Sequence, residues 1–131
     1  LQNAGPKSPS GMPEAGYIPI PKKLAQAGVR DMIRISDCRM SGTAFGTIVL
    51  HVTPEAAMGG AIGLVQNGDE IRLSVSNKSL ELLVNNAELE RRRQTTPARP
   101  AKPSRGYAKL YADHVMQADQ GADFDFLMAP S

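Results

Sequence analysis

Cysteine is almost missing from this chain: the 131 residues include one, Cys38. A single cysteine excludes an intrachain disulfide, and it excludes a cysteine-based metal cluster built from this chain alone. The same count is compatible with a reducing compartment, so we expect a cytoplasmic protein.

Long apolar runs and a strong charge of one sign are also lacking. No apolar segment approaches the ~20 residues that cross a bilayer, and no basic start followed by an apolar core indicates a signal peptide. The net charge of +2 is too small to indicate nucleic acid as a partner. Basic residues cluster at 91–93 and 99–105, where a solvated surface is the simplest interpretation. We therefore expect no membrane and no nucleic-acid partner.

The length suits one domain, which we predict to span residues 1–131. The chain begins without Met on a loop-like stretch, which is typical of a piece of a longer protein. Glycine and proline punctuate residues 1–20, so this part is predicted to be a loop or leader. Residues 95–105 hold several prolines and no apolar periodicity, and are predicted to be a connector within the domain.

Short strands and helices are predicted between these loops. Strands are expected at 29–35 and 47–52, and the alternating patterns at 71–75 and 80–84 predict a hairpin. The predicted helices are 21–27, with Pro21 in its first position and Gly28 past its end, then 85–93 and 107–118, the last terminated by Gly121, and residues 124–127 could add a strand. Together these elements predict a compact α/β domain, with a small barrel-like or sandwich-like sheet and helices outside.

Two polar loops could carry chemistry. Glu14 lies on the proline-stiffened loop 11–16, where a carboxylate could bind a hard cation such as Mg²⁺ if other ligands came from elsewhere. Ser41, Gly42 and Thr43 lie on a loop between two apolar segments and offer hydroxyl groups and backbone donors to a small ligand. From the residues alone, a surface position explains Glu14 better than a metal site does, and Ser, Gly and Thr are also ordinary turn residues.

The other reactive residue types have simpler interpretations. His51 lies in an apolar run and His114 on an apolar helix face, so both are predicted to be structural. Cys38 is predicted to be a small packed residue rather than a nucleophile.

The same two loops resemble the signature of the dihydroxy-acid and phosphogluconate dehydratase family. The similarity keeps its order along nearly the whole chain. The matching segments are Gly11–Gly16, Arg30–Thr43, His51–Ala56, the Asn67–Asp69 turn, Glu88–Arg93, Gln117–Asp119 and Gly121–Leu127. Within the family, Glu14–Gly16 and Cys38–Ser41 look more like the branch that acts on sugar acids (aldonates).

The resemblance implies a carboxy-terminal domain of a hydro-lyase that converts a 2,3-dihydroxy acid to a 2-keto-3-deoxy acid. It implies the swivelling β/β/α fold, and an amino-terminal domain, absent from this sequence, that supplies an iron–sulfur cluster and most of a Mg²⁺ site. Residue by residue, Glu14 matches the glutamate that completes the Mg²⁺ site, Ser41 the proposed catalytic base, and Gly42 and Thr43 the loop against the substrate. We further expect the full-length enzyme to be a homo-oligomer, and the domain alone to be inactive.

Two other functions stay open at this point. The chain could be a non-catalytic module that binds a small anion through Ser41–Thr43, or a structural domain of a larger assembly. The presence of both Glu14 and Ser41 argues for catalysis.

Overall fold

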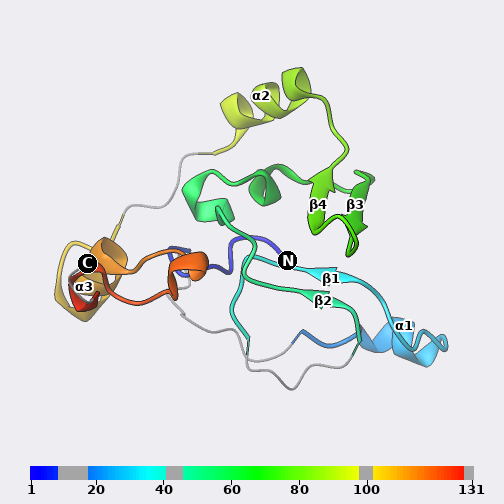
Figure 1. The fold of residues 1–131 in the computed structure, drawn as a ribbon, viewed down its shortest axis with the longest axis horizontal. Helices are drawn as coiled ribbons and strands as arrows, with labels where there is room; N and C mark the ends of the chain where they lie inside the picture. The colour runs from blue at the N-terminus through cyan, green and yellow to red at the C-terminus, as the bar shows by residue number, and fades with distance from the viewer. Residues whose placement is uncertain (9–17, 41–45, 98–101, 129–131) are drawn as a thin grey trace.

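A computed structural model describes residues 1–8, 18–40, 46–97 and 102–128. Within them, helices and short strands alternate along the chain (Figure 1). The regular elements are α1 (Lys22–Gln26), β1 (Arg34–Ile35), β2 (Ile48–Val49), β3 (Ile71–Ser74), β4 (Ser79–Leu82), α2 (Asn86–Thr95) and α3 (Gly106–His114). Four 3₁₀ turns complete them: η1 (Ala56–Met58), η2 (Ala61–Leu64), η3 (Ala118–Gln120) and η4 (Asp125–Leu127).

The first two strands form a parallel pair. Arg34 lies opposite Ile48, and Ile35 lies opposite Val49. Both predicted strands are confirmed in position, but each regular strand covers only two residues of the predicted length. His51 ends the extended run on the β2 side, because its φ of 58° is left-handed. The pair is nevertheless extended by backbone bonds from Ser36 to Val49 and from His51 to Cys38, which secure the segment that leads to Ser41.

The predicted hairpin is confirmed. β3 and β4 pair antiparallel, with Leu73 opposite Leu80. Val75, predicted on the inner face of the strand, instead lies in the turn and is 84% exposed. The hairpin therefore has a shorter alternating face than the sequence pattern indicates.

The first two helices agree with their predicted end signals. α1 ends before Gly28, whose φ of 87° suits a glycine after a helix, although Pro21 is the N-cap residue rather than the first helical residue. At α2, the side chain of Asn85 accepts a hydrogen bond from the backbone N–H of Glu88 at 2.8 Å.

The carboxy-terminal part differs from the prediction. α3 ends at His114, because Val115 turns to an extended conformation and forms an isolated antiparallel bridge with Phe124. Gly121 ends the 3₁₀ turn η3 instead of the helix. The predicted strand at 124–127 is wrong beyond that bridge, because residues 125–127 form the 3₁₀ turn η4.

Several fully buried residues of the described part are polar or charged, close to the end of β1 and to η1. Ser36, Asp37 and Cys38 are completely buried, and so is Glu55. Two two-stranded sheets are present among the described residues, and the barrel-like sheet and the swivelling architecture stay predictions. No helix in the described ranges has the length and apolar character needed to cross a membrane.

Candidate functional site

The predicted site residues Glu14, Ser41, Gly42 and Thr43 lie outside the described residues. Their flanking segments are described. Residues 4–8 lead toward Glu14, and residues 36–40 lead directly to Ser41. The geometry of these two segments shows how the chain enters both loops.

Asp37 joins the two segments. Its side chain is completely buried. One carboxylate oxygen accepts a hydrogen bond from the backbone N–H of Ala4 at 3.1 Å, and the other accepts from the N–H of Ala56 at 2.9 Å. Because a buried carboxylate is costly without such donors, these two bonds hold three distant parts of the chain together.

Glu55 holds the next residues of the first segment. Both of its carboxylate oxygens accept from the backbone N–H of Lys7, at 2.9 and 3.1 Å. Gln117 closes the arrangement: its amide donates to Glu55 Oε1 at 2.6 Å and accepts from the Glu55 N–H at 3.0 Å. Burial raises the pKa of the Glu55 carboxyl, the amide of Gln117 and the Lys7 N–H oppose that shift, and the charge of Asp37 adds to it. Asp37, Glu55 and Gln117 are called the buried anchor below.

Gly5 is required by the buried anchor. A Cβ atom at this position would lie 2.1 Å from Glu55 Oε2 and 2.7 Å from its carboxyl carbon. We therefore expect Gly5→Ala to lower the stability of the full-length protein by about 1–3 kcal/mol, because the added methyl displaces a buried, hydrogen-bonded carboxylate.

Thermal unfolding followed by circular dichroism checks this expectation. Gly63→Ala is the matched control, since its Cβ would meet the nearest atom, Ala56 Cβ, at 3.1 Å. Equal melting temperatures for the Gly5 variant, the control and the wild type would contradict the tight fit.

Two further polar side chains lie near the buried anchor. Tyr111 is buried, and its hydroxyl has no hydrogen-bond partner among the described residues. Burial raises the pKa of this hydroxyl, and the charge of Glu55 adds to the shift while that of Arg39 opposes it. Arg39 is half-buried and stands two residues before Ser41. A cation therefore accompanies the segment that enters the Ser41 loop.

The remaining reactive residues behave mostly as predicted. Cys38 is completely buried and free of any disulfide. His114 pairs with Asp125 at 2.9 Å and packs edge-on against Phe126, contacts that agree with the predicted structural role. His51 is exposed, so the prediction of a packed histidine is wrong there; the turn at its positive φ directs the residue away from the interior.

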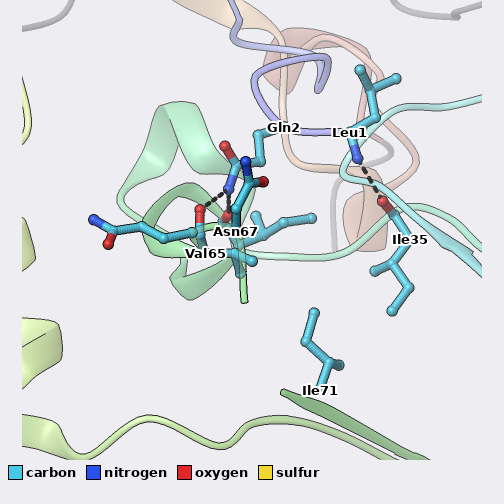
Figure 2. Close-up of a pocket in the computed structure, with 8 residues that line it drawn as sticks. Leu1, Gln2, Ile35, Val65, Asn67 and Ile71 are labelled. Carbon is cyan, nitrogen blue, oxygen red and sulfur yellow. Dashed lines mark hydrogen bonds between the residues drawn. The ribbon is translucent and has the colours of Figure 1, made fainter. Parts of the chain in front are cut away.

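A cavity of about 290 Å³ lies between the start of the chain, Ile35 of β1 and the segment 62–71 (Figure 2). Gln2 reaches across one wall and donates to the carbonyls of Ile62 and Val65 at 2.7 and 2.8 Å. The lining side chains belong to Leu1, Gln2, Ile35, Ile62, Val65, Gln66, Asn67 and Ile71. Since none of these side chains is an acid or a base, the cavity does not suit the acid–base chemistry expected of a dehydratase.

The described residues do not by themselves fit either cofactor that the family resemblance implies. They contain no group of three or more His, Cys, Asp or Glu side chains placed to hold a metal ion. Iron–sulfur clusters need cysteine thiolates, and the single cysteine is buried. Asp37 and Glu55 accept hydrogen bonds from three backbone N–H groups of other parts of the chain, and this is the role that the described contacts give them.

Sequence reasoning gave no role to Asp37 or Glu55. In the structure Glu55 is the residue before the 3₁₀ turn η1, and Asp37 follows β1 by two residues. A usable signal was present: each is a carboxylate beside an apolar strand segment, a position where a charged residue needs buried donors.

The match to known proteins now defines the class. Residues 1–122 match the family model described as "Dihydroxy-acid/6-phosphogluconate dehydratase C-terminal". The chain therefore belongs to this family of dehydratase carboxy-terminal domains.

Three curated relatives illustrate the similarity. The chain is 54% identical over its whole length to a "Putative dehydratase IlvD1" of Rhizobium meliloti (strain 1021), of which it covers 23%. It is 54% identical over 98% of its length to the 6-deoxy-6-sulfo-D-gluconate dehydratase of Pseudomonas putida, covering 22% of that protein. It is 50% identical over 97% of its length to the L-arabinonate dehydratase of Rhizobium leguminosarum bv. trifolii (strain WSM2304), again covering 22%. The chain thus spans less than a quarter of the length of these relatives.

Proposed function

We propose that this chain forms the carboxy-terminal domain of a hydro-lyase that removes water from a sugar acid, or a related 2,3-dihydroxy acid, to give a 2-keto-3-deoxy acid. The observation that carries the proposal is the family match over residues 1–122, together with relatives named as dehydratases of sugar acids. A relative at 44% identity is named dihydroxy-acid dehydratase, and this is the second substrate class.

The proposal gives each loop one role. Ser41 acts as the base that takes the proton next to the substrate carboxylate, and Gly42 and Thr43 lie against the substrate. Glu14 contributes one carboxylate to a Mg²⁺ site whose other ligands lie elsewhere in the longer enzyme. The family motifs support these roles, and so does the buried anchor: residues 4–8, which lead to the Glu14 loop, bind both Glu55 and Asp37, and Asp37 lies on the segment that leads to Ser41.

The chemistry of dehydration explains why the reaction needs metal cofactors as well as the residues of this chain. A proton next to a carboxylate is weakly acidic, so its removal needs stabilisation of the negative charge that develops on the carboxylate oxygens. Mg²⁺ and an iron–sulfur cluster would supply Lewis acidity for that charge and for the leaving hydroxyl. A serine hydroxyl is a weak base in water, so Ser41 needs a cationic environment that favours its ionised form. Arg39, two residues earlier, adds one cation from this chain.

We also propose where the cofactor ligands lie and how the whole enzyme is assembled. The cluster ligands and the remaining Mg²⁺ ligands would come from an amino-terminal domain, which would also be the main partner of this chain. A homo-oligomer in a reducing, cytoplasmic compartment would suit such a cluster.

A substrate panel tests the proposal. The full-length protein should form 2-keto acids from one or more aldonates, detected as their semicarbazones, with 2,3-dihydroxy-3-methylbutanoate as the competitor from the second class. Residues 1–131 alone are the control and should give no product. If the cofactor-loaded full-length protein forms no keto acid from any member of either class, a structural or anion-binding role replaces catalysis.

A further inference from the structure

The ends of both loops are held as well as their beginnings. The loop with Glu14 returns to the described chain at Ile18, and the loop with Ser41 returns at Gly46. In the sequence these two points are far apart. In the structure both lie against one ion pair, formed by Asp31, just before β1, and Arg34, the first residue of β1.

Arg34 binds the end of the first loop. Its guanidinium donates to the carbonyl of Ile18 at 2.8 Å, and its Nε donates to the carbonyl of Met32 at 3.2 Å. The residue is only 6% exposed. A buried arginine on a short strand is stiff, so the bond to Ile18 places the returning chain accurately against β1.

Asp31 binds the end of the second loop. Its carboxylate accepts from the backbone N–H of Thr47 at 3.1 Å and from the Thr47 hydroxyl at 3.2 Å. These bonds, the N–H of Thr47 first, lower the pKa of Asp31, so the carboxylate stays ionised at neutral pH. Gly46 lies directly on the ion pair: a Cβ there would be 2.2 Å from Asp31 Oδ1 and 2.7 Å from Arg34 Nη2.

We propose that Arg34 is a positioning residue which, with Asp31, holds the returning ends of the Glu14 and Ser41 loops together, while the buried anchor holds their beginnings. Both ends of each loop are thereby bound to neighbouring parts of the described chain. This support would keep the distance and orientation between Glu14 and Ser41 constant. The catalytic part of this inference depends on the function proposed above; the anchoring part does not.

The energetic reason is the steep dependence of catalysis on placement. A displacement of about 1 Å at a reacting group can cost on the order of 100-fold in rate. Loops supply precise sites only when their supporting contacts lock them. Arg34 touches neither substrate nor reacting atoms in this assignment, so its removal should act on the rate through the loops.

Arg34→Lys in the cofactor-loaded full-length protein tests the assignment. Lysine keeps the positive charge but replaces the planar guanidinium fork with a single nitrogen, which cannot reproduce the separate Nη1 and Nε bonds to the carbonyls of Ile18 and Met32. Hydrogen–deuterium exchange of peptides covering residues 9–17 and 41–45 should become about tenfold faster, the loss expected for broken buried hydrogen bonds. On the preferred aldonate, kcat should fall about 10- to 100-fold with a smaller change in KM.

Arg92→Lys is the matched control. Arg92 is also buried, at 8% exposure, pairs with Asp69 at 2.6 Å and donates to the carbonyl of Leu64 at 2.9 Å. It lies on α2, and its partners Leu64, Asp69 and Glu88 border neither loop in the sequence. Its substitution should lower the melting temperature comparably but leave exchange in the two loops and kcat near the wild-type values.

Asp31→Ala gives a second variant in case Arg34→Lys fails to fold, since the Asp31 side chain is 48% exposed. It should accelerate exchange in residues 41–45 more than in 9–17.

Unchanged exchange in both loops, or exchange that rises equally in Arg92→Lys, would overturn the anchoring. Faster loop exchange with unchanged kcat would overturn the positioning role. Faster exchange in a protein without dehydratase activity would support the anchoring and sink only the proposed function.

Discussion

Ser41→Ala should nearly abolish turnover of the full-length enzyme while leaving its fold and cofactor content intact. A general base typically contributes about 10²- to 10⁴-fold to a rate. Alanine removes the hydroxyl without adding bulk, and the preceding segment stays fixed by Asp37 and by the bond between the Cys38 N–H and the Ser36 hydroxyl at 3.0 Å. The loss should therefore fall on kcat, with substrate affinity little changed.

Steady-state kinetics, metal analysis and the absorption spectrum of the cluster check this together. Ser76→Ala is the control, because Ser76 is exposed in the hairpin turn and its hydroxyl hydrogen-bonds with that of Ser74 at 3.2 Å. Turnover of the Ser41 variant within a factor of a few of the wild type would exclude Ser41 as the base. Loss of the cluster in that variant would indicate a folding defect instead.

The elements that could be predicted from the sequence are those with local causes. Asn85 caps α2 by accepting from the N–H of Glu88, a bond between residues three apart. The hairpin follows from alternation within one short stretch, and its partners Leu73 and Leu80 are close in sequence. Neither element depends on the rest of the chain, so the pattern alone was enough.

The elements that were missed have distant causes. α3 ends early because Val115 pairs with Phe124, and no signal near Val115 announces that partner. The buried anchor joins Lys7, Glu55 and Gln117 across more than one hundred residues. A carboxylate in the sequence gives no indication of which backbone N–H groups will surround it, so its burial could not be predicted from its neighbours.

The candidate site also has one part that could be predicted from the sequence and one part that could not. The roles of Glu14 and Ser41 came from similarity to a family, and they remain predictions because both residues lie outside the described part of the chain. What the structure adds is the support around them. The motif Arg30–Thr43 now has an interpretation beyond its serine: Asp31 and Arg34 contact the ends of both loops, and Asp37 contacts the beginning of the first.

Substrate choice is not decided by overall similarity in this domain. Its identity is 54% to a dehydratase named for a sulfonated hexonate and 50% to one named for a pentonate, over nearly the same residues. A domain at least 50% identical to both relatives is expected to contribute chemistry that the two share. We therefore expect the size and charge of the substrate to be read mainly by residues outside this chain, with Ser41 and Glu14 serving a step common to both.

Glu14→Gln should weaken Mg²⁺ binding by the full-length enzyme by about tenfold or more, since a neutral amide replaces an anionic ligand of a dication and the lost attraction is worth at least about 1.4 kcal/mol. Isothermal titration calorimetry of the metal-free enzyme with Mg²⁺ measures this loss of affinity and does not require turnover. Glu90→Gln is the matched control, because Glu90 is exposed on α2 and pairs only at the surface, with Arg93 at 3.4 Å.

Glu14→Gln and Ser41→Ala should then respond differently to added Mg²⁺. Saturating Mg²⁺ should restore part of the activity of the Glu14 variant, because its defect lies in metal affinity, whereas it should restore none in Ser41→Ala. Unchanged Mg²⁺ affinity in Glu14→Gln would remove that residue from the metal site and would leave Ser41 as the only chemical contribution assigned to this domain. If both expectations hold, this domain supplies one metal ligand and one base, and its buried charges serve to keep the two in position.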